Sequence, residues 1–245
     1  MRDDADVLLV TAAAAWMKAD GGDNTLGQPV ASSAIPMMLR RRLVGTALTA
    51  IRCGLAALPS TGKPVEIVSC GRHGDLARTQ RLLFGMMKGE PPSPLDFSLS
   101  VHNALAGMLD LLRRERTGHT SIAAGRATLT AALTELWARL HCAPDRAALL
   151  LYTEPPVPEE LEDRTDPALG GTVLALGIEH RRGTGPCTLP LAMLHRSPAT
   201  GEADKDCEIS ARLIAGALRD GGTVRLSATG GFDWLVTAPA GSAAE

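Results

Sequence analysis

The run from Ala147 to Tyr152 constrains the fold most, because it is almost continuously apolar. Such a run is typical of a strand that is covered on both faces, since a half-exposed strand alternates apolar and polar residues. Before this run, strand-like and helix-like segments alternate. Val65–Cys70 predicts a strand, and apolar spacing predicts helices over 76–87, 105–116 and 127–140. This alternation implies a layered α/β sheet.

Further elements are expected in the first part of the chain. Val7–Val10 predicts a short strand that leads into a run of alanines. A helix is expected from Ser32 or Ser33 to about Leu58, with Pro36 in its first turn, where the missing N–H has no helical partner. Asp75 is expected to cap the helix that begins at Leu76, and Glu90–Asp96 predicts a proline-rich loop.

After the apolar run the pattern changes. Thr172–His180 and Cys187–His195 are strand-like and separated by a short turn, so we expect them to form a hairpin. A helix over 208–219 and two strands, over 223–226 and 232–237, are expected to follow, with the strands joined through Gly230 and Gly231. We expect one domain over 1–245, with 239–245 as a disordered tail.

Composition excludes several classes of function. The formal net charge is −2 and only 3% of residues are aromatic, which argues against a nucleic-acid partner. The apolar run over 7–17 is too short to cross a bilayer, so no integral membrane segment is expected. The five cysteines form no Cys-x-x-Cys pair, which argues against a zinc ribbon and for a reducing, cytoplasmic location. No glycine-rich nucleotide loop is present, and no cofactor is expected.

The most specific motif is Ser-Pro-x-Asp-Phe-Ser-x-Ser-Val-His-Asn-Ala over 93–104, followed by Thr-Ser-Ile-Ala-Ala-Gly over 120–125. The segments over 71–79 and 149–156 lie in the same order and at a similar spacing. Together these segments resemble the chain-length factors of aryl polyene pigment clusters, which are short β-ketoacyl-synthase-like proteins. The resemblance covers residues 30 to 240.

The resemblance implies a thiolase-like half-fold, truncated relative to a full ketosynthase. In a full ketosynthase the nucleophilic Cys lies at the tip of a helix in the first half, and two His lie in the second half. Aligning the glycine of that motif to Gly125 places Ile122 at the Cys position, and a small shift places Ala123 or Ala124 there. None of the three has a nucleophilic atom, so no acyl-enzyme is expected on this chain.

The resemblance also implies a role: a non-catalytic subunit that pairs with a full-length ketosynthase and elongates a polyenoyl chain bound to an acyl carrier protein. The pair of helices around 105–133 is expected to shape the acyl pocket, with Met108 as the preferred residue. The strand over 120–123 is expected to pair across the subunit interface, which predicts an isolated subunit of poor solubility. The expected motif and interface residues are Ser100, His102, Asn103, Ser121, Ile122, Ala123 and Gly125, and the acyl-pocket candidates are Leu105, Met108, Leu112, Leu129 and Leu133.

Other readings compete at several positions. Arg40–Arg42 and the arginines at 113, 114 and 116 are either solvated helix faces or docking sites for an acidic carrier protein. Cys70 and His73 are three apart, but zinc requires three or four ligands, so no metal site is expected. Two alternative functions remain: a small acyltransferase or thioesterase that uses Ser100, His102 or Cys70, and a scaffold with a degenerate ketosynthase fold.

Overall fold

A single mixed sheet organises the molecule. The computed structural model describes residues 7–18, 23–164, 171–180, 190–201, 206–228 and 231–240, with only the backbone of 162–164. In this part of the chain the strand order is β4-β3-β5-β6-β1-β7-β9-β8, with β2 paired to β1. The β3 strand is parallel to β4 and β5, and the other pairs are antiparallel. The strands are β1 (Leu8–Met17), β2 (Asn24–Leu26), β3 (Val65–Cys70), β4 (His119–Ile122), β5 (Ala147–Glu154), β6 (Thr172–His180), β7 (Ala192–Pro198), β8 (Gly222–Ala228) and β9 (Phe232–Ala238).

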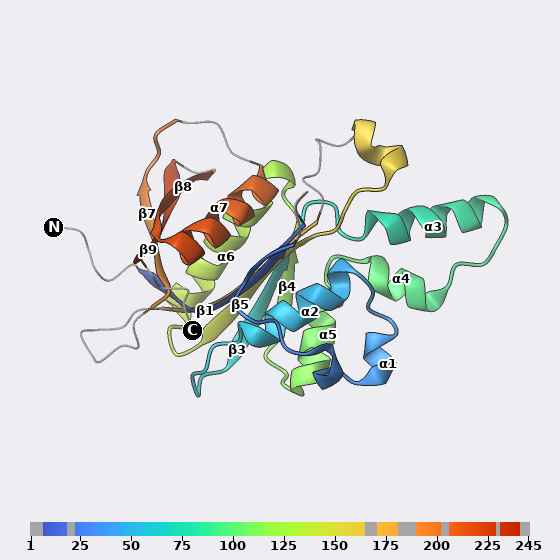
Figure 1. Ribbon diagram of the computed structural model, residues 1–245, viewed down its shortest axis with the longest axis horizontal. Coiled ribbons are helices and arrows are strands. Elements are labelled where there is room, and N and C mark those ends of the chain that lie inside the picture. Colours follow the sequence, from blue (N-terminus) through green and yellow to red (C-terminus); the bar gives the residue numbers. More distant parts are fainter. Residues whose placement is uncertain are drawn as a thin grey trace.

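Helices cover both faces of this sheet, as Figure 1 shows. On one face lie α6 and α7, and on the other lie α2 and α5, while α1, α3 and α4 extend away from the sheet. The helices are α1 (Met37–Arg40), α2 (Thr46–Ala56), α3 (Leu76–Met87), α4 (Pro94–Ser100), α5 (Ala104–Arg113), α6 (Thr128–Cys142) and α7 (Cys207–Asp220). Short 3₁₀ helices are η1 (Ser32–Ala34), η2 (Gly125–Ala127) and η3 (Glu159–Arg164).

The sheet separates two hydrophobic cores. The larger core joins α6 and α7 to the even-numbered side of β5 (Leu150, Tyr152) and to β7, β8 and β9. The smaller core joins α2 and α5 to the opposite side of β5 (Leu149, Leu151). Every residue of β5 is buried, because successive side chains point to opposite faces and both faces are covered. The predicted strand and layered α/β architecture are therefore confirmed.

The single helix predicted from Ser32 or Ser33 to Leu58 is wrong. The segment instead forms η1, α1 and α2 in succession. Gly45, which precedes α2, has a φ of 56°. Residues other than glycine rarely adopt this backbone conformation, which allows the sharp turn between α1 and α2. The loop predicted over Glu90–Asp96 is also wrong at its end, because Pro94 begins α4. The Asp96 N–H donates to Ser93 Oγ at 3.3 Å, which caps this helix.

The predicted hairpin between Thr172–His180 and Cys187–His195 is wrong as well. The β6 and β7 strands do not pair, because β1 lies between them: Leu9 is in register with Glu179 on one side and Met193 on the other. β1 itself extends beyond Val10, through the alanines, to Met17. Residues 187–189 of the predicted hairpin lie outside the described residues.

Other local predictions are confirmed. Asp75 caps α3, with its Oδ1 accepting the Arg78 N–H at 2.9 Å. The predicted helix over 208–219 corresponds to α7, and β8 pairs with β9 as expected. Gly230 in their connection, and residues 241–245 of the predicted tail, lie outside the described residues.

Candidate functional site

A cavity of about 380 Å³ lies at the carboxyl ends of β3 and β5, on the face covered by α2 and α5. Its walls come from the start of α2, the first two turns of α3 and the junction between α4 and α5. Its volume falls within the range of about 300–1,000 Å³ that is typical of small-molecule sites. The cavity is therefore the candidate site.

The cavity has a buried floor and an exposed mouth. The floor consists of Ser69, Leu151 and Thr153, which are all buried and lie on β3 and β5. The mouth consists of Val44, Arg81, Val101 and His102, which are all exposed. A molecule that enters from the surface would thus meet the mouth first and the strand ends last.

Two polar side chains of the cavity wall are held by neighbours. Ser69 Oγ contacts Ser121 Oγ on the adjacent strand and donates to the Thr120 carbonyl at 3.4 Å. Arg78 is only 6% exposed, and its Nε donates to Asp75 Oδ2 at 3.0 Å while its Nη1 pairs with Asp96 on α4. This arginine links α3 to α4, and a buried charge of this kind is stable only when it is paired.

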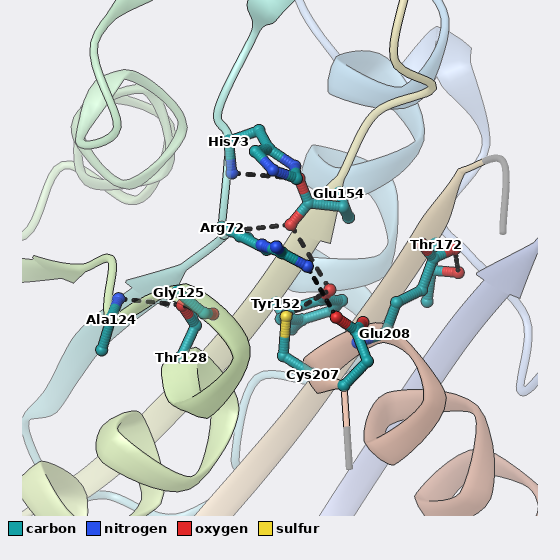
Figure 2. A network of polar contacts seen from close by, with 11 residues as sticks. Arg72, His73, Ala124, Gly125, Thr128, Tyr152, Glu154, Thr172, Cys207 and Glu208 are labelled. Atoms are coloured by element: carbon teal, nitrogen blue, oxygen red, sulfur yellow. Dashed lines mark hydrogen bonds and ion pairs between the residues drawn. The ribbon is translucent and has the colours of Figure 1, made fainter. Parts of the chain in front are cut away.

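A network of buried polar groups fixes the turn between β3 and α3, which forms one side of the cavity (Figure 2). Glu154, 2% exposed, accepts the backbone N–H of Arg72 at 2.6 Å and that of His73 at 3.1 Å. The His73 Nδ1 lies 3.1 Å from the same carboxylate. Gly71 passes so close to β5 that a Cβ there would lie 2.4 Å from the Thr153 carbonyl oxygen. A side chain at position 71 would displace the turn.

The network continues to the start of α7. The Tyr152 hydroxyl lies 3.4 Å from Glu154 Oε2 and 3.4 Å from Cys207 Sγ, and it can donate its one hydrogen to either. The Arg72 Nη1 donates to Asp206, the N-cap of α7, at 2.7 Å. The turn beside the cavity is thus connected to the helix on the opposite face of the sheet (Figure 2).

Burial sets the protonation of this network. It raises the pKa of Glu154 above its ordinary value, although the N–H groups of Arg72 and His73 and the His73 ring act in the opposite direction. Burial also raises the pKa of Cys70, and it raises the pKa of Cys207 to about 11. Thiols in such surroundings stay neutral near pH 7, and the thiol is a far weaker nucleophile than the thiolate. The structure therefore offers no support for Cys70 as an activated nucleophile.

The three residues predicted at the nucleophile position all lie before the tip of α6. Ile122 is the last residue of β4, whereas the tip of α6 is formed by η2, from Gly125 to Ala127. Ile122 therefore does not lie at the helix tip, and Ala123 and Ala124 lie in the connection before it. The Ala124 N–H donates to Thr128 Oγ1 at 2.9 Å, and that hydroxyl donates to the Gly125 carbonyl at 2.7 Å, which fixes this connection (Figure 2). The motif spacing did not show that β4 continues to Ile122 or that α6 is preceded by η2 at 125–127.

The Ser-Val-His-Asn motif lies between α4 and α5. Ser100 ends α4 and donates its hydroxyl to the Phe97 carbonyl at 2.9 Å. His102 lines the cavity mouth beside Gly74, where a Cβ would lie 3.3 Å from the imidazole ring. Asn103 is the N-cap residue of α5, but its side chain makes no capping hydrogen bond. Within the described residues no hydrogen bond joins His102 to Ser100 or Cys70, so the structure provides no catalytic pair there.

The five acyl-pocket candidates are divided between the two faces of the sheet. Leu105 lines the cavity. Met108 and Leu112 are half-buried against the smaller core, beside α2. Leu129 and Leu133 are fully buried in the larger core on the opposite face, so neither can line this cavity. Helical spacing alone did not show that α5 and α6 face opposite sides of the sheet.

Sequence reasoning did not bring together the polar residues of the cavity floor. Ser69 and Thr153 lie at the carboxyl ends of two strands that become neighbours only in the folded sheet. A usable signal was present, because polar residues ending two apolar strands are typical of sites at the edge of an α/β sheet. In the part of the chain that the structure describes, no group of three His, Cys, Asp or Glu side chains is placed to hold a metal. None of the described helices is long and apolar enough to span a bilayer.

Solved structures with a similar fold include ketosynthase complexes. The ketosynthase ApeO in complex with its chain length factor ApeC, from Xenorhabdus doucetiae, aligns with a TM-score of 0.71 and 24% identity over 94% of this chain and 99% of that chain. A type II polyketide synthase complex of ketosynthase and acyl carrier protein, AntDE with AntF, aligns at 0.61 and 12% identity over 96% of this chain and 99% of that chain. The ishigamide ketosynthase/chain length factor aligns at 0.57 and 16% identity over 80% and 68%.

At these identities the likeness shows the fold, and the thiolase-like half-fold expected from the sequence is confirmed. No curated protein matches the chain significantly. The family model described as β-ketoacyl synthase, N-terminal domain, matches residues 14–230, which is most of the chain. On this match the chain belongs to the β-ketoacyl synthase family, whose N-terminal domain it shares.

Proposed function

We propose that this chain, as one domain, is a non-catalytic chain-length-factor subunit that pairs with a full-length β-ketoacyl synthase. The observation that carries the proposal is an apolar lobe formed by α1, α3 and α4, which extends away from the sheet (Figure 1). Monomeric soluble proteins rarely expose large contiguous apolar surfaces. Eight large apolar side chains of this lobe are exposed: Met37, Met38, Leu83, Phe84, Met86, Met87, Leu95 and Phe97.

The cavity mouth adjoins this lobe. Val44 follows α1 and is 65% exposed, and Val101 follows α4 and is 43% exposed. A partner that covers the lobe would therefore also cover the mouth. An acyl chain held by that partner could then extend into the cavity without passing through water.

The edge of the sheet supports the same partner surface. β4 is the last strand in the sheet order and pairs only with β3 among the described strands. It carries the motif residues Ser121 and Ile122, and Ala123 follows it. An unpaired edge of this kind can bind a strand of another molecule.

The helix tip supports a silent role for this chain. Gly125, Arg126 and Ala127 form the tip of α6, and none of them provides a nucleophilic atom of the kind used in acyl transfer. The partner would supply the Cys and both His. In the proposed reaction the partner's acyl thioester is attacked by the carbanion that forms when a malonyl carrier protein loses CO₂. The new C–C bond lengthens the chain on the carrier protein, and the partner's thiol is released.

The carrier protein is the second proposed partner. Arg41 and Arg42, beside α1, and Arg114 and Arg116, after α5, are exposed and could attract an acidic surface. Arg113 is a poorer candidate, because its guanidinium donates to the Val65 carbonyl at 3.2 Å and pairs with Glu115.

Co-expression with a full-length ketosynthase tests the proposal. We expect a stable complex with equal numbers of both chains in size-exclusion chromatography, and condensation that is abolished when the partner's Cys is replaced. Met87→Asp on the lobe should prevent complex formation. Ile209→Asp on α7, a 40% exposed residue on the opposite face, is the matched control and should not. A free chain that ignores the ketosynthase and hydrolyses or transfers acyl thioesters alone would overturn the proposal.

A further inference from the structure

Two basic side chains at the cavity mouth have no partner in the part of the chain that the structure describes. Arg81 on α3 and His102, between α4 and α5, both line the cavity and are exposed. Neither side chain forms a hydrogen bond or an ion pair with another described residue. Arg81 therefore presents an uncompensated positive charge, and His102 presents an imidazole N–H that can still donate.

The imidazole of His102 lies against the wall of the cavity. Gly74 also lines the cavity, and a Cβ at that position would lie 3.3 Å from Cε1 of the ring and 3.4 Å from Nε2. Arg81 is on α3, the helix that begins shortly after Gly74, and its side chain is long and flexible. Because both side chains line one mouth, a single small anionic group can contact both.

The other charged side chains in the described part of the cavity wall are already paired with each other. Asp75 accepts the Arg78 N–H at 2.9 Å and the Arg78 Nε at 3.0 Å. Arg78 also pairs with Asp96 on α4, a carboxylate that does not line the cavity. An anion at the mouth would thus meet Arg81 and His102, while the carboxylate of Asp75 is bound by Arg78.

The rest of the cavity wall is suited to an apolar chain. Most of the remaining lining side chains are aliphatic, among them Leu43, Ala47, Ala77, Leu99, Leu105 and Leu151. An alkyl chain that enters this space leaves water, which favours binding in proportion to the apolar area removed. The cavity therefore combines an apolar interior with a basic mouth.

We propose that this cavity binds a single-chain amphiphile with a carboxylate head, such as a fatty acid, with its alkyl chain inside and its head at Arg81 and His102. A guanidinium can bind a carboxylate through two parallel hydrogen bonds, and the imidazole N–H adds another donor. A neutral head of the same size leaves Arg81 without a counter-charge. The proposal goes beyond the proposed function, because it concerns a ligand of this chain alone. Such a ligand and an acyl chain held by the ketosynthase could not occupy the cavity together.

Calorimetric titration of the isolated chain with octanoate and with octanamide near pH 7 tests the proposal. The two probes share the alkyl chain and differ in the charge of the head. We expect octanoate to bind about fivefold more tightly at low salt, as for a partly solvated ion pair, and the preference to shrink in about 1 M salt. Arg81→Met should remove the preference, and Arg81→Lys should retain most of it. Lys88→Met removes an exposed positive charge at the far end of α3, outside the cavity, and as the matched control it should leave the preference unchanged.

Two further variants locate the bound ligand. Ala77→Phe on the cavity wall should abolish binding of both probes, because the larger side chain takes the space of the alkyl chain. Met87→Ser removes apolar surface from the exposed lobe and should leave both affinities unchanged. Binding that survives in Ala77→Phe and disappears in Met87→Ser would place the ligand on the lobe and overturn the proposal. Circular dichroism checks that Ala77→Phe is folded. If it is not, the Arg81 variants still decide, since Arg81 is exposed and its replacement leaves the core intact.

The outcomes separate this proposal from the proposed function. Absence of binding, equal affinities for the two probes, or a preference that survives in Arg81→Met would overturn the proposal, whether or not a complex with a ketosynthase forms. A chain that prefers octanoate through Arg81 but forms no complex would support the proposal and overturn the proposed function alone.

Discussion

The two outer layers of this molecule differ in how completely they bury their apolar residues. On the face covered by α6 and α7, leucines such as Leu129, Leu133 and Leu136 are fully buried. In the apolar lobe of α1, α3 and α4, the larger apolar side chains remain exposed, and Met87 is 82% exposed. The first region needs nothing beyond this chain for its stability. The second region exposes large apolar side chains that no other part of the described chain covers.

The largest effect on stability is expected from removing a buried side chain on the face covered by α6 and α7. Leu136→Ala should lower the free energy of unfolding by about 2–5 kcal/mol, because it leaves a cavity in the larger core. Urea denaturation followed by circular dichroism measures the change. Leu111→Ala on α5 is the control, since Leu111 is 68% exposed and the same change should stay within about 0.5 kcal/mol. Equal losses of stability in the two variants would contradict the division of the molecule into regions that bury their apolar side chains and regions that leave them exposed.

An intermediate effect on stability is expected at Glu154, which holds the turn between β3 and α3 beside the cavity. Glu154→Gln should cost about 1–3 kcal/mol, because an amide cannot accept both N–H groups of Arg72 and His73 with the same geometry. The effect also depends on pH. The folded chain holds the Glu154 proton more tightly than the unfolded chain, so its contribution to stability falls as the pH rises from the ordinary value of 4.5 through the raised pKa of the folded state.

Denaturation at several pH values between 4.5 and 8 measures this slope. Glu154→Gln should remove that part of the decline, whereas Glu159→Gln, an exposed control in η3, should preserve it. A slope that is identical in all three proteins would show that Glu154 does not titrate differently in the folded state.

The smallest effect on stability is expected in the apolar lobe. Phe84→Ser should change the free energy of unfolding by no more than about 0.5 kcal/mol, because half of this side chain is already exposed. The same change should raise the solubility of the isolated chain, measured as the concentration that remains after ultracentrifugation. Destabilisation as large as that of Leu136→Ala would mean that the lobe is packed in solution and is not a partner surface.

The sequence predicted elements that depend on local chemistry and missed those that depend on distant segments. The buried β5, the Asp75 cap and α6 follow from apolar runs, spacing and capping residues. The pairing of β1 with β6 and β7 could not be predicted, because the sequence between 180 and 192 is typical of a hairpin connection and gives no sign of an inserted strand. The arrangement of the cavity could not be predicted for the same reason, since Thr153 and Ser69 become neighbours only when the sheet forms. The motif also gives no information about where β4 ends, so the start of α6 could not be placed from the sequence.

The central position of β1 has a consequence for how the chain folds. Thr11 hydrogen-bonds to Gly177, 166 residues further along the chain, and β7 follows later still. Folding is slow when contacts join distant segments, because the loop between them must close before any contact is made. On a ribosome β1 would emerge long before β6 or β7 is synthesised, and the residues of β1 that β2 does not pair would stay unpaired for most of translation. Chaperones that bind nascent chains should therefore matter more for the yield of this protein than for a protein whose strands pair in sequence order.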